Sequence, residues 1–544
     1  MSSSSGLAPS TVRIGHRYRA NRLNGPYDAI VIGSGIGGMT AAACLAELGQ
    51  RVVVFEQHYT AGGFTHSYAR NGYEWDVGVH YIGDVGAKHT LARRLFDFVS
   101  GGQLEWAPMD PHFDRIFLGD ESFDLVATPK AFRAELLKHF PDEQAAIDEY
   151  LKRISQAADA MRLITLEKLL PTPAAALVRG MRRLKAPRWL NHTTREVLES
   201  LTRNQKLIAV LTGQWGDNGL PPAQSSFIIH ALIARHYLYG GYYPVGGASR
   251  MAETIIPQIQ KNGGELFTYA SVEEILIENG RATGVRMADG TEVRAPVVIS
   301  NAGVFNTFGK LLPEAVAKRS GYLKKLDTVK RSMASLGMYI GIQDTAENLG
   351  LPKTNYWLYS GEDYEGSLER FFANPEQEEI PLVYISFPSA KDPAFLDKYP
   401  GRATIEIVAP GPHDWFARWA DKPWGKRGAD YDALKEQWSQ RLLERLYQHF
   451  PQLRGRIDYY ELSTPLSTDF FCRYETGEIY GLDHDPSRFE QRWLKPKTTI
   501  PGLYLTGQDV ITCGVAGAMI GGLATAVAVT GRRGAGLAKR FFTG

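Results

Sequence analysis

A glycine-rich turn between two short apolar runs constrains the fold of this chain more than any other feature. Residues 29–32 read Ala-Ile-Val-Ile and residues 52–55 read Val-Val-Val-Phe, so both runs predict buried strands. The turn, residues 33–38, reads Gly-Ser-Gly-Ile-Gly-Gly, and a helix is expected over residues 39–48. A strand, a glycine turn, a helix and a second strand form a βαβ unit, which belongs in a parallel sheet.

The glycines of this turn have the spacing that a bound pyrophosphate requires. Gly33, Gly35 and Gly38 match the pattern G-x-G-x-x-G, in which the glycines permit a tight turn, close approach of the phosphates and close packing of the helix. Gly37 lies in the same turn, and the free N–H groups of the helix N-terminus would stabilise the phosphate charge. Glu56 ends the second strand, where an acid accepts hydrogen bonds from ribose hydroxyls. We therefore expect a dinucleotide here rather than a purely structural turn.

Two further features favour FAD over NAD as the dinucleotide. Gly62 and Gly63 have the spacing at which flavoproteins bring their backbone against the flavin. A strand and turn that end in Asp509 resemble the second FAD motif of such proteins, and a helix that begins at Gly514 would stabilise negative charge on the flavin pyrimidine. The strand near Val272 resembles the one that meets the adenine. The residues expected to bind the cofactor are Gly33, Gly35, Gly37, Gly38, Glu56, Gln57, Gly62, Gly63, Val272, Gly507, Asp509, Val515 and Ala516.

The α/β signals are interrupted twice, which predicts a discontinuous nucleotide-binding domain. The chain has 544 residues, enough for about two to four domains. The fold class expected is α/β, with a Rossmann-like FAD-binding domain and an inserted α+β substrate domain, an arrangement that resembles the amine oxidases and phytoene desaturases. Residues 1–26 are basic and are expected to form a disordered arm. The FAD-binding domain is assigned to residues 27–100, 243–310 and 495–533, and the substrate and membrane-contact domain to residues 101–242 and 311–494.

Composition and charge exclude several classes of protein. The net charge of +2 gives no reason to expect a nucleic-acid partner, and the three cysteines are too far apart for a metal site or a disulfide framework. We therefore expect no metal, and a cytoplasmic protein. Residues 510–530 carry no charge but predict a buried helix rather than a membrane span. Residues 168–190 have basic and apolar side chains at helical spacing, which indicates either a peripheral membrane contact or an ordinary solvated face.

Two longer strings narrow the resemblance. Residues 56–63 read Glu-Gln-His-Tyr-Thr-Ala-Gly-Gly, and residues 76–83 read Asp-Val-Gly-Val-His-Tyr-Ile-Gly. Both closely resemble the retinol saturase family, which belongs with the phytoene desaturases and carotenoid isomerases. The resemblance implies FAD, an apolar conjugated polyene as substrate, and chemistry at carbon–carbon double bonds. Phe64 departs from the animal members, in which a small residue or cysteine is expected.

The reaction that this resemblance favours is reduction of a C=C bond. Hydride from the flavin reaches one carbon and a proton reaches another, so an acid is needed. The candidate acids are His80, Tyr81 and His66, although His80 and Tyr81 are equally suited to bracing the flavin. Further candidates for the cavity wall are His230, His236, Tyr237, Trp357, Tyr384 and Glu406, with a plain core helix as the alternative for the first three.

Other functions are compatible with the same motifs. A carotenoid desaturase or a cis–trans isomerase would use the same scaffold, and a lipid- or prenyl-binding protein would share the fold without catalysis. The chain shows no second nucleotide fingerprint, which leaves three alternatives: NAD(P)H that binds transiently as the electron donor, another protein as the donor, or a flavin that is reduced only once and serves a redox-neutral reaction.

Overall fold

Strands from three distant parts of the chain form one parallel sheet in the computed structural model, which describes residues 12–542 except 171 and 186. Every neighbouring pair in this sheet is parallel. In spatial order the strands are β1 (His16–Arg17), β10 (Glu265–Thr268), β3 (Val52–Phe55), β2 (Ala29–Ile32), β14 (Val297–Ser300) and β20 (Leu503–Leu505). The prediction of a discontinuous Rossmann-like sheet is confirmed, and both predicted strands have the predicted bounds.

Alternate side chains of the central strands pack on the two faces of this sheet. Ala29 and Val31 share a hydrophobic cluster with the helices α1 (Ile36–Glu47), α9 (Arg250–Gln260) and α19 (Gly514–Thr530). Ile30 and Ile32 belong to a second cluster that includes Ile275 and Val285. These two residues lie in a three-stranded sheet of β11 (Val272–Glu278), β12 (Arg281–Met287) and β13 (Glu292–Arg294). The sheet is therefore buried on both faces, as a parallel sheet requires.

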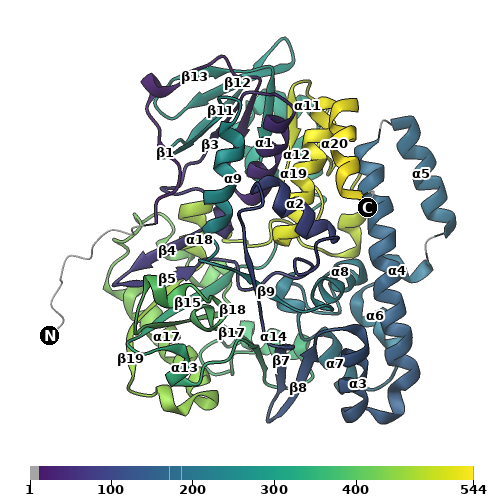
Figure 1. The fold of residues 1–544 in the computed structure, drawn as a ribbon, viewed down its shortest axis with the longest axis vertical. Coiled ribbons are helices and arrows are strands. Elements are labelled where there is room, and N and C mark those ends of the chain that lie inside the picture. The colour runs from purple at the N-terminus through teal and green to yellow at the C-terminus, as the bar shows by residue number, and fades with distance from the viewer. Residues whose placement is uncertain (1–11, 171, 186, 543–544) are drawn as a thin grey trace.

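The two long intervening regions contribute strands to a second, seven-stranded sheet. Its strands, in order, are β19 (Ile457–Ser463), β15 (Ser335–Ile342), β18 (Ala403–Pro410), β17 (Leu382–Ser386), β16 (Asn355–Tyr359), β7 (His112–Leu118) and β8 (Glu121–Val126). Figure 1 shows this sheet in the lower half of the molecule and the six-stranded sheet above it. The helices α4 (Gln144–Leu169), α5 (Thr172–Lys185) and α8 (Phe227–Tyr237) lie at one side of both.

Part of the basic N-terminal arm is ordered, contrary to the sequence-based expectation. Residues 16 and 17 form β1, which pairs with Phe267 and Thr268 of β10. The backbone O of Ile14 also accepts a hydrogen bond of 2.9 Å from Ala61 N. The edge of β10 would otherwise carry unpaired N–H and C=O groups, so pairing with the arm satisfies them despite its polar composition. Residues 1–11, also expected to be disordered, lie outside the described residues.

The uncharged segment 510–530 forms the helix α19, which is largely buried against α1, as predicted. Across the part of the chain that the structure describes, no helix is long and apolar enough to cross a membrane.

The close contact between α1 and α19 depends on glycine at one position. A Cβ atom on Gly522 would lie 2.5 Å from Gly37 O and 2.9 Å from Ala41 N, and neither backbone atom can move alone. We expect Gly522→Ala to destabilise the protein by about 1–3 kcal/mol through overpacking, measured as a lower thermal unfolding midpoint. Gly536→Ala, in the helix α20 (Arg532–Phe542), is the control because nothing lies within 4 Å of its added Cβ. An unchanged midpoint for Gly522→Ala would show that the helices are not in this contact.

Candidate active site

One cavity of about 1380 Å³ connects the edge of the parallel sheet with the second sheet. Its walls come from the loops after β2 and β3, from the strands β15 to β18, and from the helices α4 and α8. Eleven of the thirteen residues expected to bind the cofactor line it, namely Gly33, Gly35, Gly37, Glu56, Gln57, Gly62, Gly63, Val272, Asp509, Val515 and Ala516. The other two, Gly38 and Gly507, pack directly behind Gly33 and Gly37.

The glycine turn is held by backbone contacts that leave no room for side chains. Gly33 has φ +93°, and a Cβ on Gly38 would lie 2.3 Å from Gly33 O. A Cβ on Gly63 would lie 2.9 Å from the Cα of Gly35, so these two segments touch. Gly35 is the N-cap of α1, and no side chain caps the helix there. The first N–H groups of α1 are therefore available to an anion.

Three hydrogen bonds from Ser34 and His58 hold the carboxylate of Glu56 in position. Its Oε2 accepts from both the backbone N and the Oγ of Ser34 at 2.8 Å, and its Oε1 accepts from His58 N at 2.8 Å. The Oγ of Ser34 accepts in turn from Gly62 N at 3.1 Å. This carboxylate therefore links the loop after β2 to the loop after β3. Ser34 was not predicted, although its place inside the glycine turn gave a signal.

Asn301 is a second residue that the sequence did not reveal. It follows β14 directly, and its backbone N donates to Ile32 O at 2.8 Å. A Cβ on Gly35 would lie 2.9 Å from its Nδ2, and a Cβ on Gly507 would lie 2.3 Å from its Oδ1. The Asn301 carboxamide therefore fills the space between the two glycine turns. In the sequence, the one indication of its role is that a polar residue directly follows a buried strand, as Glu56 follows β3.

The turn after β20 presents polar groups to the cavity. Asp509 is buried, and its Oδ2 accepts from Val304 N at 2.8 Å. Thr506 lines the same wall, and its buried Oγ1 has no hydrogen-bond partner among the residues that the structure describes. An orphaned hydroxyl here fits a polar ligand that supplies the missing partner. The helix α19 begins immediately afterwards, with Val515 and Ala516 on the cavity wall.

His80 lies on the cavity wall and is paired with a buried acid. Its Nδ1 is 2.8 Å from the Oε2 of Glu406, whose Oε1 accepts from Asp76 N at 2.7 Å. Burial raises the pKa of Glu406 to about 8 and lowers the pKa of His80 to about 3. Burial therefore disfavours the charged form of both members of the pair. Glu406, expected as a wall residue, instead lies behind His80.

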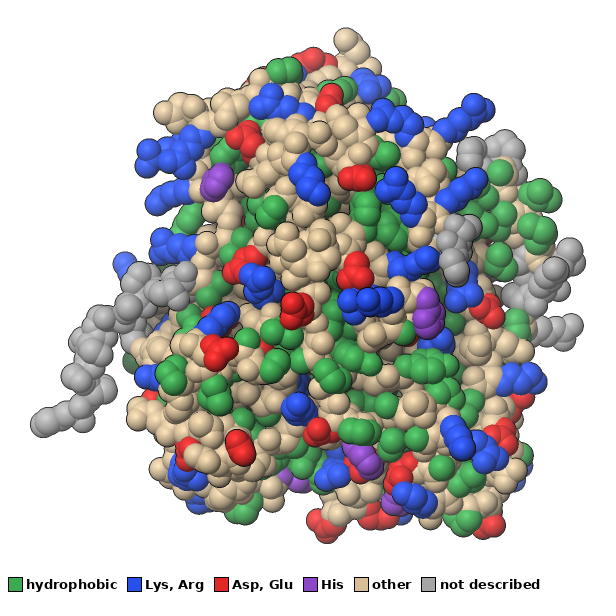
Figure 2. Space-filling model, in the orientation of Figure 1, with side chains coloured by type: hydrophobic (Ala, Val, Ile, Leu, Met, Phe, Trp, Pro, Cys, Tyr) green, Lys and Arg blue, Asp and Glu red, His purple; other side chains and the backbone are tan. Residues whose placement is uncertain are grey.

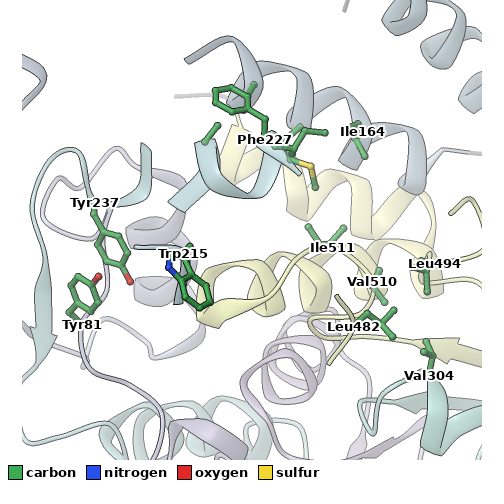
Figure 3. Close-up of a cluster of buried hydrophobic side chains, with 14 of the residues drawn as sticks. Tyr81, Ile164, Trp215, Phe227, Tyr237, Val304, Leu482, Leu494, Val510 and Ile511 are labelled. Atoms are coloured by element: carbon green, nitrogen blue, oxygen red, sulfur yellow. The ribbon is translucent and has the colours of Figure 1, made fainter. Parts of the chain in front are cut away.

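Tyr81 also borders the cavity, but it bonds to a different acid. Its ring stacks on Tyr237 with the centroids 4.0 Å apart, and Figure 3 shows the two side by side with Trp215 nearby. Its hydroxyl donates to the Oδ2 of Asp114 at 2.8 Å. Asp114 accepts a further bond of 2.7 Å from the Nε2 of Gln214. Neither Asp114 nor Gln214 could be predicted from the sequence, because the fold brings both to Tyr81.

His66 lines the cavity but faces the glycine loop. Its Nδ1 is 2.5 Å from Gly63 O, and its ring lies 4.7 Å from that of His58. Burial lowers the pKa of His66 to about 3. Among the described residues, no hydrogen bond joins it to His80 or Tyr81. The geometry therefore makes His66 a brace for the loop, and separates it from the other two candidate acids.

The remaining candidates divide between the cavity wall and the core. His236, Tyr237, Trp357 and Tyr384 line the cavity, and so does Phe64. His230 does not, and its Nε2 bonds to the hydroxyl of Tyr150 at 3.1 Å.

Known proteins resemble this chain in both sequence and fold. Residues 31–99 match the family model described as an NAD(P)-binding Rossmann-like domain. All-trans-retinol 13,14-reductase of Macaca fascicularis is 38% identical over 95% of this chain and 87% of its own length. Chloroplastic prolycopene isomerase of Arabidopsis thaliana is 28% identical over 95% of this chain and 85% of its own length. Wild-type putrescine oxidase has a TM-score of 0.60 at 14% identity, covering 93% of this chain and 99% of that one.

The match of residues 31–99 to the Rossmann-like model indicates a flavin or dinucleotide cofactor, and the likeness to putrescine oxidase shows the fold. The resemblance that residues 56–63 and 76–83 carry is confirmed over almost the whole chain. At this identity and coverage, the chain belongs to the all-trans-retinol 13,14-reductase family of oxidoreductases.

Proposed function

We propose that this chain is an FAD-dependent reductase that saturates a C=C bond of an apolar conjugated polyene, retinoid-like or carotenoid-like. The observation that carries the proposal is the cavity of about 1380 Å³, which joins the glycine turns to apolar walls. The named substrates of the relatives, retinol and prolycopene, are polyenes, which supports this substrate class.

The residues around the glycine turns suit FAD in particular. The N-terminus of α1 suits the pyrophosphate, Glu56 the ribose, and Val272 the adenine. Gly62 and Gly63 would lie against the flavin, and the N-terminus of α19 would stabilise negative charge on its pyrimidine. Reduced FAD supplies a hydride, and the protein must align the substrate and deliver a proton.

The apolar part of the cavity would align the polyene. Its walls include Ile229, Leu232, Met333, Trp357, Leu382 and Val408. Such walls exclude water and hold a long apolar molecule in one orientation, and positioning of this kind lowers the barrier by several kcal/mol, on the order of 7 or more in the best cases. His80 and Tyr81 border the same space and each bonds to a buried carboxyl group. The proton would therefore reach the substrate at the part of the wall that His80 and Tyr81 form, whereas His66 contacts the loop of Gly63.

The proposed reaction can be tested on the purified protein. A yellow protein that bleaches when NAD(P)H is added without oxygen would establish a flavin and its donor. Incubation with retinol or a carotenoid should then give a product with two additional hydrogens by mass spectrometry. A product with two fewer hydrogens would identify a desaturase, an unchanged mass with altered geometry an isomerase, and a colourless protein a lipid-binding protein.

Glu56 provides a test of the cofactor site. Glu56→Gln removes the charge that would accept the ribose hydrogen bonds, and such bonds contribute about 1.5–3 kcal/mol. We expect FAD to bind roughly 10- to 100-fold more weakly, measured as the flavin-to-protein absorbance ratio after dialysis. Glu105→Gln, at an exposed acid, is the matched control. Full flavin occupancy in Glu56→Gln would contradict the assigned role.

We also propose a peripheral membrane contact at the end of α4 and along α5. The exposed fraction is 42% for Leu166, 68% for Leu177 and 44% for Met181, all three large apolar side chains. Figure 2 shows hydrophobic side chains on the part of the surface that α5 forms at the right of the view. Leu166 also lines the cavity, so a polyene could enter there directly from lipid.

The basic residues of segment 168–190 support this contact less than the sequence predicted. Lys168 is turned inward, and its Nζ donates to Val510 O at 2.6 Å, while Arg179 pairs with Glu167 at 2.6 Å. The side chains of Arg182, Arg183, Lys185 and Arg188 lie outside the described part of the structure. The proposed contact therefore rests on the apolar residues.

Vesicle flotation tests this surface. With phosphatidylserine-containing vesicles, we expect the wild-type protein to float and the double variant Leu177→Glu, Met181→Glu to stay in the soluble fraction, because two charges in the apolar face oppose insertion. Leu396→Glu is the control, because Leu396 is equally exposed, at 44%, on the separate helix α16 (Phe395–Lys398). Equal flotation of all three proteins, or none by the wild type, would remove the membrane contact.

A further inference from the structure

Asp217 is a further acid on the cavity wall, close to Tyr81, and no sequence motif predicted it. It ends the short helix η5 (Trp215–Asp217) and lines the cavity beside Gly216. Its Oδ2 lies 3.3 Å from the hydroxyl of Tyr81. The Sγ of Cys513, the N-cap of α19, lies 3.8 Å from its backbone O. This carboxyl group therefore lies where the flavin end of the cavity meets the apolar end.

The hydrogen bonds around Tyr81 determine which acid carries a proton. The Tyr81 hydroxyl has one hydrogen, and its shorter bond, 2.8 Å, is to the Oδ2 of Asp114. Asp114 also accepts from the Nε2 of Gln214 at 2.7 Å and from the Nδ2 of Asn355 at 2.9 Å. Three donors stabilise Asp114 as the ionised partner. Among the described side-chain hydrogen bonds, Asp217 has only the longer contact of 3.3 Å with the Tyr81 hydroxyl, so its ionised form is stabilised less than that of Asp114.

The surroundings of Asp217 favour the same protonation state. Burial, together with repulsion from Asp114, raises the pKa of Asp217 well above its ordinary value. Hydrogen bonds from Asn355, Tyr81 and Gln214 oppose the effect of burial on the pKa of Asp114. Two carboxyl groups that share one hydroxyl seldom ionise together, so one of them keeps its proton.

We propose that Asp217 is the general acid that protonates the polyene, with Tyr81 and Asp114 holding it in position. This rests on the proposed function. In the balanced step, a hydride from reduced flavin forms a C–H bond at one alkene carbon, and the O–H bond of Asp217 breaks to form a C–H bond at the other. The substrate gains two electrons and two hydrogens, the flavin is oxidised by two electrons, and Asp217 is left as a carboxylate. Tyr81 can then turn its hydrogen towards Asp217 until a solvent proton restores the acid.

The variant Asp217→Asn tests this assignment. A general acid contributes about 10²–10⁴-fold, so we expect polyene reduction to fall at least about 100-fold. Flavin content and bleaching by NAD(P)H should be unchanged, which also shows that the variant folds. Asp217→Glu should recover part of the activity. Asp97→Asn is the matched control, because Asp97 is partly buried and pairs with Arg93 at 2.7 Å but does not line the cavity, and it should keep full activity.

An infrared measurement can detect the protonated carboxyl group of Asp217 without any substrate. The difference spectrum of wild type minus Asp217→Asn should show the C=O stretch of a protonated carboxylic acid that shifts in D₂O, because the band of buried Glu406 cancels between the two proteins. Turnover of Asp217→Asn within tenfold of the wild type, or absence of this band from the difference spectrum, overturns the assignment. If the wild type bleaches but reduces no polyene, the proposed reaction is wrong, and the infrared band alone then decides whether Asp217 holds a proton.

Discussion

The parallel alignment of β3, β2, β14 and β20 brings the ends of four neighbouring strands to one edge of the sheet. A polar or glycine-rich segment follows each of them. Glu56 follows β3, Gly33 follows β2, Asn301 follows β14 and Thr506 follows β20. In open parallel sheets, ligands bind outside the carboxyl ends of the strands, because loops from several strands converge there. The register of this sheet therefore sets the positions of these four groups, around which a cofactor would bind.

The strands, the glycine turn and Glu56 could be predicted from the sequence because their signals are local. A run of apolar residues, a fixed spacing of glycines and an acid after a strand all lie within about thirty residues, the size of one βαβ unit. Asn301 could not be found in this way, because its role depends on strand order and not on neighbouring residues. Glu406 reaches His80 across 326 residues of sequence, and only the assembled second sheet reveals that contact. The prediction of disorder for residues 12–26 rests on composition alone. Composition cannot show that the exposed edge of β10 is available to pair with this segment.

The adjacent residues His80 and Tyr81 bond to two separate acids. A buried lysine, Lys391, connects the hydrogen-bond networks of the two residues. Lys391 donates to His80 O at 3.0 Å and also to the side chain of Asn355. Asn355 in turn donates to Asp114, the partner of Tyr81. A buried charge is costly unless it is paired and hydrogen-bonded. This network meets that requirement for Lys391 and Asp114, and it fixes both wall residues relative to each other. Removal of one charged partner would leave an uncompensated charge in the core. This would destabilise the protein more than replacement of the whole network by apolar residues.

The discontinuity of the parallel sheet has a consequence for how the protein is made. The two central strands, β2 and β3, leave the ribosome early, but β20 and α19 are translated only after residue 502. Until then, Gly37 lacks the contact with Gly507, and one side of α1 has no helix to cover it. Through most of its synthesis, the nascent chain therefore has an incomplete set of glycine turns and exposes one apolar face of α1. Cofactor capture must come at the end of translation, and a ribosome that stalls before β20 would release a chain prone to aggregation.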